Sequence, residues 1–467
     1  MSEAIGEMIL PGTYIEVRAE GLIGVGGIST GNIGIVGTAN RGPIGQVHIL
    51  GSYSEALDVF GSYDRWSTTG TPLTLTRALE QVFKGGGSTV YAVRIASGSP
   101  GTMQWSLRGA GDPPAELFKV SASSPGSWAN GMKVTFASDT DTLTVELGRV
   151  KETFTGATAG ALATEINNSS RLLTAAAPAA ADTDKAVDSV AVVSANAGTD
   201  GANVTTTEAD AGLDLLQTQA VNIVTVAGMD AKTIGATLLS HLEATENDGR
   251  ERIAVVGASS DDVSKIASDD ANSLSNPRAI LVGPGILADD AARTEANKQV
   301  KLPASYAAAL IAGRLSTLAP HISLTNKDVA ADGLTTEYTR AEQKQLLNNR
   351  VLVLQKNLGI RVLKGITTDT GAFRQISVRR IVDYAKAGVR IGSNPYIGRL
   401  NNSRVRAALK ATLDGFLSGM VLDEMLIAYQ LEVSATRAQE INGIALVTMT
   451  LQPTFSIDFV KVIMTLS

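Results

Sequence analysis

The chain has 467 residues, of which 44% are hydrophobic, so it is long enough for about three domains with ordinary buried cores. It contains no cysteine, which excludes a disulfide framework, a thiolate zinc site and a cysteine nucleophile. Its 40 basic and 46 acidic residues give a net charge of −6, and only 4% of its residues are aromatic, which favours strands and tight turns over bulky ligand pockets. The sequence has neither a basic leader nor an apolar run of about eighteen residues, so we expect neither a secretion signal nor a membrane span.

The first residues, 1–23, are predicted to form an extended arm. A Pro-Gly pair opens an alternating segment in which Ile15 and Val17 face one way and Tyr14 faces the other. No neighbouring segment offers this strand a partner. We therefore expect it to pair with something outside its own domain.

Strands and helices alternate in two stretches, residues 24–102 and 219–340. This alternation predicts an α/β domain, a sheet flanked by helices, that is interrupted in the sequence. The predicted strands lie at 32–38, 47–50, 89–95, 221–226, 252–256 and 279–282, and the predicted helices at 73–84, 231–242, 260–271 and 303–315.

Residues 103–218 have a different texture and are predicted to form an inserted β-rich domain. Short Thr/Val strands, such as 133–136 and 142–147, are separated by turns of Gly, Ser and Asp. Because insertions are tolerated at exposed sites where few contacts cross, we expect the linkage of this domain to cost the core of the α/β domain little stability.

The last region, residues 341–467, is predicted to be an α+β domain, so the fold class as a whole is α/β and α+β multidomain. It combines strands at 351–355, 360–363 and 373–378 with helices at 378–386 and 403–419 and a final meander. The alternating residues of the last strand are Val460, Val462, Met464 and Leu466. Strand-like segments at both ends predict arms that complete a sheet in another subunit.

Positive charge is concentrated between Arg340 and Lys410, where 15 Lys and Arg accompany 3 acidic residues. The rest of the chain has 25 basic and 43 acidic residues, so a block of about +12 accompanies a body of about −18. Such a block attracts an acidic polymer or an acidic protein surface. The candidate docking residues lie in and before the helix at 403–419, and are Arg399, Arg404, Arg406 and Lys410.

The motifs that could carry chemistry lack their structural context. Ser29 matches Gly-x-Ser-x-Gly, but a glycine-rich loop precedes it and a strand follows it. The loop 21–27 lacks the Gly-Lys-Ser/Thr ending of a phosphate-binding loop. His48, His241 and His321 have no other candidate ligand at metal-binding spacing. We therefore expect no catalytic residue, no cofactor site and no metal site.

Short motifs near both ends of the chain occur in a recognisable order. They are Pro11–Glu16, Gly27–Gly37, Arg41–Pro43, Tyr53–Gly61, Phe83–Arg94, Arg379–Tyr384, Asn401–Gly419 and Phe455–Lys461. In this order and spacing they resemble the motifs of contractile tail sheath proteins. Within the insertion the resemblance is looser and rests on Pro125–Gly131, which leaves the role of that domain open.

The resemblance implies a structural protein and not an enzyme. It implies a helical sleeve of stacked hexameric rings around an inner tube, with terminal arms that add strands to neighbouring subunits and an extended state that contracts to drive the tube through a target envelope. The implied partners are further copies, the tube protein, and baseplate and tail terminator proteins, without nucleic acid. The implied location is a virion tail or an injection particle assembled in the cytoplasm of the producing bacterium. The basic helix would face the tube, and the insertion would point away from the axis.

Two other functions stay open on the residues alone. A nucleic-acid-binding protein would use the basic block at 340–410 and would bind DNA with a salt-dependent affinity. An α/β hydrolase would require Ser29 to lie beside a histidine.

Overall fold

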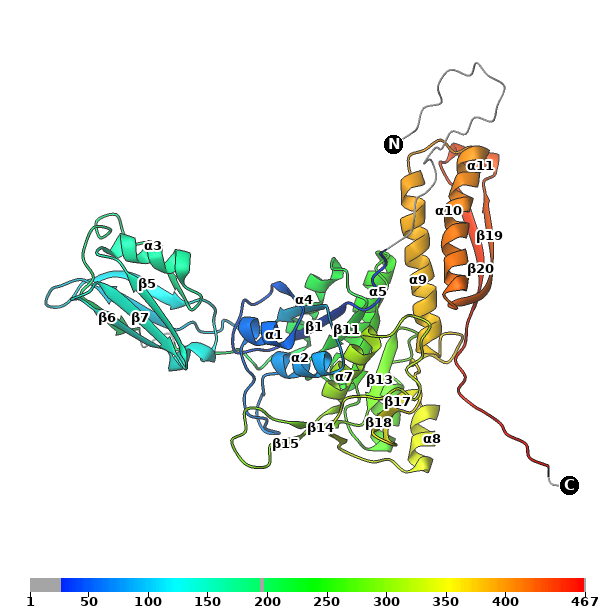
Figure 1. Ribbon diagram of the computed structural model, residues 1–467, viewed down its shortest axis with the longest axis horizontal. Coiled ribbons are helices and arrows are strands. Elements are labelled where there is room, and N and C mark those ends of the chain that lie inside the picture. Colours follow the sequence, from blue (N-terminus) through cyan, green and yellow to red (C-terminus); the bar gives the residue numbers. More distant parts are fainter. Residues whose placement is uncertain (1–26, 194–196, 466–467) are drawn as a thin grey trace, which may run out of the picture. The chain divides into compact units, whose positions relative to one another are not determined.

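The computed structural model describes residues 27–193 and 197–465, and the chain divides into two units (Figure 1). The larger unit comprises Gly31–Thr317 and Asn326–Thr370. Among the described residues, the smaller unit comprises residues 27–30, Leu318–Thr325 and residues 371–465. The predicted mixture of helices with several sheets is confirmed.

An eight-stranded sheet organises the larger unit, in the order β18-β17-β13-β12-β11-β1-β3-β2. The six inner strands are parallel, and the edge strands β18 and β2 are antiparallel to their neighbours. The inner strands are mostly buried apolar runs, as expected where helices cover both faces of a sheet. The bounds are β1 Ile33–Gly37, β2 Val47–Leu50, β3 Val90–Arg94, β11 Ile223–Val226, β12 Ile253–Gly257, β13 Ala279–Gly283, β17 Val351–Lys356 and β18 Ile360–Val362.

The helices of this unit begin at side chains that cap them. Ser52 accepts a hydrogen bond from the backbone N–H of Glu55 in α1, and Asp230 accepts one from Thr233 in α5. Helix α7 is buried on nearly every side, because its sequence is mostly alanine and other small or apolar residues. The bounds are α1 Tyr53–Phe60, α2 Leu75–Lys84, α4 Thr206–Gln217, α5 Ala231–Asn247, α6 Val263–Lys265, the π-helical η2 Ile266–Ala271, α7 Ala304–Ser316 and α8 Arg340–Asn348, with a small sheet of β14 Ile286–Asp289, β15 Gln299–Leu302 and β16 Gly333–Leu334.

The inserted domain has a core of its own. A four-stranded sheet, β10-β4-β5-β9, and a three-stranded sheet, β6-β7-β8, enclose Trp105, Phe118 and Phe154 together with helix α3. The predicted strands at 133–136 and 142–147 are confirmed as β6 and β7. The bounds are β4 Gln104–Arg108, β5 Glu116–Ala122, η1 Ser127–Gly131, β6 Lys133–Ala137, β7 Thr142–Leu147, β8 Val150–Thr155, α3 Ala159–Ser169, β9 Leu173–Ala175 and β10 Ser189–Val192.

The insertion ends before the predicted boundary at residue 218. Helix α4 buries Ala209, Leu213 and Leu216 in the same core as Val36 and Val224 of the large sheet. These three α4 residues recur at the helical spacing of four and three positions, so they lie on one face. Helix α4 therefore belongs to the α/β domain and not to the insertion.

A buried arginine fastens the insertion to the α/β domain. Arg94, at the end of β3 and 0% exposed, donates hydrogen bonds to the carbonyl oxygens of Gly42 at 2.6 Å and Pro125 at 2.7 Å. Beside it, the N–H and hydroxyl of Ser127 bind the carboxylate of Asp200 at 2.6 and 2.7 Å. Burial lowers the pKa of Arg94 to about 10. Arg94 thus joins the loop at Gly42 in the α/β domain to the insertion at Pro125.

The smaller unit packs two long helices against a hairpin (Figure 1). Ile381 and Ala385 of α9 and Leu417 and Met420 of α10 form its main core, next to the β19–β20 hairpin. The α9–α10 approach is close at Gly388, where a Cβ would overlap the ring of Phe416. The bounds are α9 Ile376–Ser393, η3 Asn394–Tyr396, α10 Ser403–Leu422, β19 Leu426–Ser434, α11 Arg437–Ile441 and β20 Leu446–Pro453.

Two predictions for the C-terminal region are wrong. The strands predicted at 351–355 and 360–363 extend the large sheet, where β17 pairs with β13, so the unit boundary follows Thr370 and does not coincide with residue 341. No strand forms at 373–378, because α9 begins at Ile376 and its apolar residues recur at helical spacing. Within the single chain the meander is a two-stranded hairpin, and residues 460–465 form no strand, so their predicted pairing with another subunit stays a prediction.

Candidate interaction surfaces

The basic block is not one continuous face. Its part up to Lys364 lies in the larger unit, and its part from Arg374 onward lies in the smaller unit. Several of its arginines serve the interior of the chain. Arg350 donates to backbone carbonyl oxygens, and Arg379 pairs with Asp383 at 2.6 Å. Only part of the predicted positive charge is therefore available to an outside partner.

Arg380 also forms hydrogen bonds in the interior of the chain. Its side chain is almost fully buried and donates to the carbonyl oxygens of Thr30, Leu318 and Ala319 at 2.8 to 3.3 Å. Burial lowers the pKa of Arg380 to about 10. Arg380 thus joins α9 to two backbone segments, at Thr30 and at Leu318–Ala319, which lie at the boundaries between the two units along the chain.

Two of the four predicted docking residues make contacts inside the chain. Arg406 pairs with Glu440 at 2.9 Å and also donates to the side chain of Asn401 at 2.8 Å. Both partners of the ion pair are largely shielded, with side chains 15% and 21% exposed. Arg399 is exposed, and its guanidinium lies 5.4 Å from the ring centre of Tyr396. Arg406 is therefore committed to a contact within the chain.

Arg404 and Lys410 are exposed on α10, and neither takes part in an ion pair within the part of the chain that the structure describes. The internal partner of Arg406 was not evident from the sequence, because Glu440 is 34 positions away and only the turn after β19 brings α11 back to α10. Arg399, Arg404 and Lys410 remain as surface cations.

The β19–β20 hairpin is a sheet of only two strands. Its register runs from Leu426 opposite Pro453 to Ser434 opposite Leu446. Alternate residues of both strands, such as Leu431, pack on the helices of the smaller unit. Across residues 27–193 and 197–465 neither outer edge of this sheet has a partner strand. Two long edges thus offer unpaired backbone groups to another strand.

The segment after the hairpin exposes most of its apolar side chains. Residues 454–465 form neither helix nor strand, and Phe459, Val460, Val462 and Met464 are 84%, 82%, 71% and 86% exposed. Isolated apolar residues are common on surfaces, but several exposed apolar residues within one short segment mark an interaction site. The other predicted arm residues, Tyr14, Ile15, Val17 and Leu466, lie outside the described residues.

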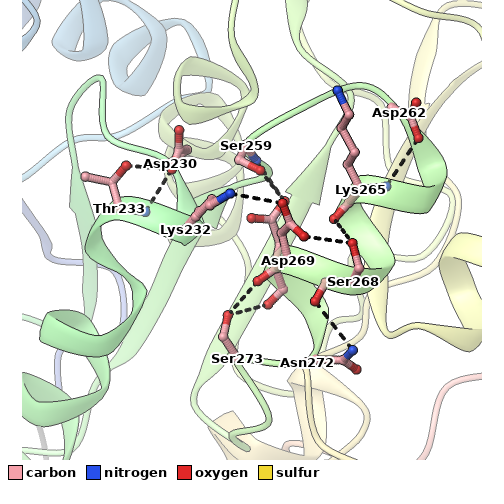
Figure 2. Close-up of polar contacts among 11 residues, drawn as sticks. Asp230, Lys232, Thr233, Ser259, Asp262, Lys265, Ser268, Asp269, Asn272 and Ser273 are labelled. Carbon is pink, nitrogen blue, oxygen red and sulfur yellow. Dashed lines mark hydrogen bonds and ion pairs between the residues drawn. The ribbon is translucent and has the colours of Figure 1, made fainter.

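Figure 2 shows a polar cluster that follows β11 and β12 in the larger unit. Asp230 caps α5, Lys232 pairs with Asp269 at 3.1 Å, and the buried Asp270 accepts hydrogen bonds from the N–H and hydroxyl of Ser259, both at 2.9 Å. Burial raises the pKa of Asp270. These contacts cap helices and hold the π-helical turn against the sheet. We find in them a structural network and no catalytic arrangement.

The motifs considered for chemistry do not assemble. Ser29 lies in a segment without helix or strand, and β1 follows it, so the strand–turn–helix of a nucleophile elbow is not formed there. His48, His241 and His321 lie on β2, on α5 and in the loop after α7. Among the described residues no three side chains are grouped so that they could hold a metal ion. Nor is any helix in this part of the chain both long and apolar enough to cross a bilayer.

Comparison with known proteins identifies two matching family models. Residues 202–368 match the phage tail sheath protein central domain, and residues 368–467 match the phage tail sheath C-terminal domain, which together cover more than half of the chain. Over 209 residues, 41% of this chain, the sequence is 27% identical to the tail sheath protein of Mycobacterium phage Bxz1. That match spans 35% of the phage protein, so the chain covers about a third of its length.

Solved structures with the same fold are similar over nearly the whole chain. The sheath tail protein from Desulfitobacterium hafniense has a TM-score of 0.64 at 16% identity, with 95% of this chain and all of that chain covered. The one from Listeria innocua has a TM-score of 0.65 at 15% identity, with 92% and 93% covered. The contracted helical sheath of the anti-feeding prophage has a TM-score of 0.58 at 14% identity, with 98% and 99% covered. At these identities the similarity establishes the fold.

Proposed function

This chain belongs to the phage tail sheath family, and we propose that it is the structural subunit of a contractile sheath that polymerises around an inner tube. In this proposal the subunits form stacked hexameric rings, and an extended state contracts to drive the tube through a target envelope. The work is done by assembly and rearrangement, without catalysis. The particle is a virion tail or an injection device that is assembled in the producing bacterium.

One observation carries this proposal: an exposed apolar segment, residues 460–465, occurs in the same chain as a hairpin whose two outer edges have no partner strand among the described residues. Val460, Val462 and Met464 alternate, as do the residues of β19 and β20 that pack on the helices. A strand with this alternation would continue the buried face of the hairpin while its backbone satisfies an open edge. We propose that the C-terminal arm of one copy pairs with the hairpin of a neighbour, and that residues 1–23 supply a second strand.

The tube contact is assigned to the exposed cations of α10 and of the loop before it. Arg399, Arg404 and Lys410 would face an acidic tube surface, whereas Arg406 supports α11 from within. Each exposed pair contributes only about 0.2 to 1 kcal/mol, so a contact repeated in many copies holds the extended state and still releases on firing. The inserted domain would point away from the axis. Baseplate and terminator proteins would cover the two ends of the polymer.

Truncation of the arms tests the proposal. A chain that ends after Asp458 should fold with an unchanged melting temperature and remain monomeric, since its open edges lose the strand that completes them. A chain that lacks residues 1–20 should behave in the same way. The matched control is a chain that lacks only the last residue, Ser467, which should still assemble. Sheaths of normal length from the longer truncations, observed by negative-stain microscopy, would refute strand exchange.

A further inference from the structure

Exposed apolar side chains gather at one end of the smaller unit, where the loop between α9 and α10 meets the turn after α11. The side-chain amide of Asn401 donates to the carbonyl oxygen of Ile444 at 2.9 Å. Arg406 donates to the side chains of both Asn401 and Glu440, at 2.8 and 2.9 Å, and so holds the loop and α11 together. We call the exposed apolar residues of these two segments the tip patch: Ile397, Leu400, Ile441, Ile444 and Leu446.

The side chains of the tip patch are open to solvent. Ile397, Leu400 and Ile441 are 78%, 79% and 74% exposed, and Ile444 and Leu446 are 49% and 46% exposed. Single exposed apolar residues are common, but five of them on two segments that are bonded to each other form a patch of the kind that binds a partner. The tip patch is therefore a candidate binding surface.

The surroundings of the tip patch are positive. Residues 397–410 and 435–446, which carry the patch, contain five basic residues and one acidic residue, Glu440. That carboxylate is shared by two guanidinium groups, those of Arg406 and Arg437, at 2.9 and 3.1 Å. Its negative charge is thus used within the chain. A partner that fits this surface combines apolar side chains with negative charge.

The first ten residues of the chain have this composition. Their only charged side chains are the carboxylates of Glu3 and Glu7. They precede the alternating residues of the predicted arm strand, which begin at Tyr14, so the pairing of that strand leaves them without a role. Their apolar residues include Ile5, Met8, Ile9 and Leu10.

The chain is long enough to bring residues 1–10 to the tip patch of the same subunit. Residues 27–30 belong to the smaller unit, and Arg380 of α9 donates to the carbonyl oxygen of Thr30 at 3.1 Å. From Arg380 to its last residue, Ser393, α9 rises by about 20 Å. Residues 11–26 can span up to about 50 Å. A segment on the same chain also has a higher effective concentration at the patch than a segment of a second copy.

We propose that residues 1–10 cover the tip patch of their own subunit before assembly. The apolar side chains of the segment shield the patch from water, and its two carboxylates lie among the cations of the tip. The contact itself goes beyond the proposed function, and its consequence rests on that function. When the arm leaves to pair with a neighbour, it uncovers the tip patch and the tube-docking Arg399 beside it. A subunit thus becomes able to contact the tube after it has delivered its arm.

Cross-linking within the unassembled chain tests the contact, because the chain has no cysteine of its own. The tip pair, Ser2→Cys/Asn442→Cys, leaves every apolar residue of the segment and the patch intact. The matched control pair, Ser2→Cys/Asp423→Cys, has its second thiol at the other end of α10, and Asn442 and Asp423 are both exposed. The control end lies nearer to the attachment of the arm, since Leu417 packs with Ile381 of α9. A segment without a preferred site would therefore react faster in the control pair.

A short bismaleimide should join the tip pair within single chains at least about tenfold faster than the control pair, at a yield that dilution does not change. Adding Ile5→Ser/Ile9→Ser to the tip pair should slow the reaction about fivefold or more, because the apolar contact is lost. Mass spectrometry of digests identifies the joined peptides, and melting curves by circular dichroism establish that each variant is folded. Equal rates in the two pairs would overturn the inference. Products that are dimers and disappear on dilution would also overturn it, because the segment would then belong to another copy.

The arm-truncation assay separates this inference from the proposed function. If the tip pair shows no preference while removal of residues 1–20 abolishes assembly, the contact at the tip patch is wrong and strand exchange stands. If chains without residues 1–20 still form sheaths, strand exchange by this arm is wrong, and a tip pair that reacts preferentially still establishes the contact.

Discussion

Replacing His241 by glutamine tests how a buried imidazole beside a cation lowers the stability of the larger unit at acidic pH. His241 is 3% exposed on α5, and its Nε2 lies 3.1 Å from Nη1 of Arg252. Because a guanidinium only donates, Nε2 accepts this hydrogen bond and the proton of the neutral ring resides on Nδ1. Protonation of the ring would place two cations in contact within a buried site. The folded state therefore resists the second proton.

The magnitude follows from the pKa. Burial, and then the charge of Arg252, lower the pKa of His241 from 6.5 to about 4. The unfolded chain takes up this proton below pH 6.5 and the folded chain does not, so the stabilising contribution is complete above pH 6.5 and is lost as the pH falls towards 4. One pKa unit corresponds to about 1.4 kcal/mol, so the loss is about 2 kcal/mol at pH 5 and about 3 kcal/mol below pH 4.

Urea unfolding of the unassembled chain at pH 7 and pH 5 measures this loss. Glutamine preserves an acceptor for Arg252 but does not titrate, so the His241→Gln variant should lose about 2 kcal/mol less than the unmodified chain between the two pH values. His321→Gln, in the loop after α7, should keep the full loss because His241 is intact. An equal pH dependence in the His241→Gln variant and the unmodified chain would refute the reasoning.

Three further predictions concern packing. Leu417→Ala should cost about 2 to 5 kcal/mol, measured by urea unfolding, because this fully buried side chain joins α9, α10 and the hairpin; a cost below 1 kcal/mol would contradict that core. Gly126→Ala should destabilise the junction of the insertion, because a Cβ at this positive φ would overlap the carbonyl oxygen of Asn40. The expected result is faster proteolysis at the junction, and an unchanged rate of proteolysis would contradict the close packing there. Deletion of residues 100–203 through a short linker should leave a folded chain by circular dichroism, whereas deletion of 100–219 should not, because it removes α4 from the core; equal stability of the two would contradict the revised boundary.

Local patterns predicted the elements of the α/β domain well. The buried strand at 32–38 and the helix at 231–242 are confirmed as β1 and α5. They could be predicted because apolar runs, helix caps and terminating glycines depend on residues that are close in the sequence. The assignment of β17 to a domain failed, since the pairing of β17 with β13 is not encoded in the neighbours of either strand. Helix α4 was missed within Thr-rich sequence, although its spacing of Ala209, Leu213 and Leu216 is a helical signal.

The candidate surfaces divide in the same way. The exposure of Arg404 and Lys410 on a helix follows from local sequence. The ion pair between Arg406 and Glu440 could not be predicted in this way, because it depends on tertiary packing of α11 against α10. The junction at Arg94 was also beyond local reasoning, because its carbonyl partners come from two distant loops. Charge counts along a sequence thus locate a basic block, but the fold decides which of its charges reach the surface.

Hydrogen–deuterium exchange of the chain before and after assembly tests strand exchange most directly. In the unassembled chain the backbone amides of residues 459–465 should exchange within seconds, because the segment has no regular structure. In assembled sheaths these amides and those along one outer edge of the β19–β20 hairpin should become protected together, by a factor of about a hundred or more, as ladder hydrogen bonds form. Sheaths in which residues 459–465 still exchange as fast as in the unassembled chain would contradict the account.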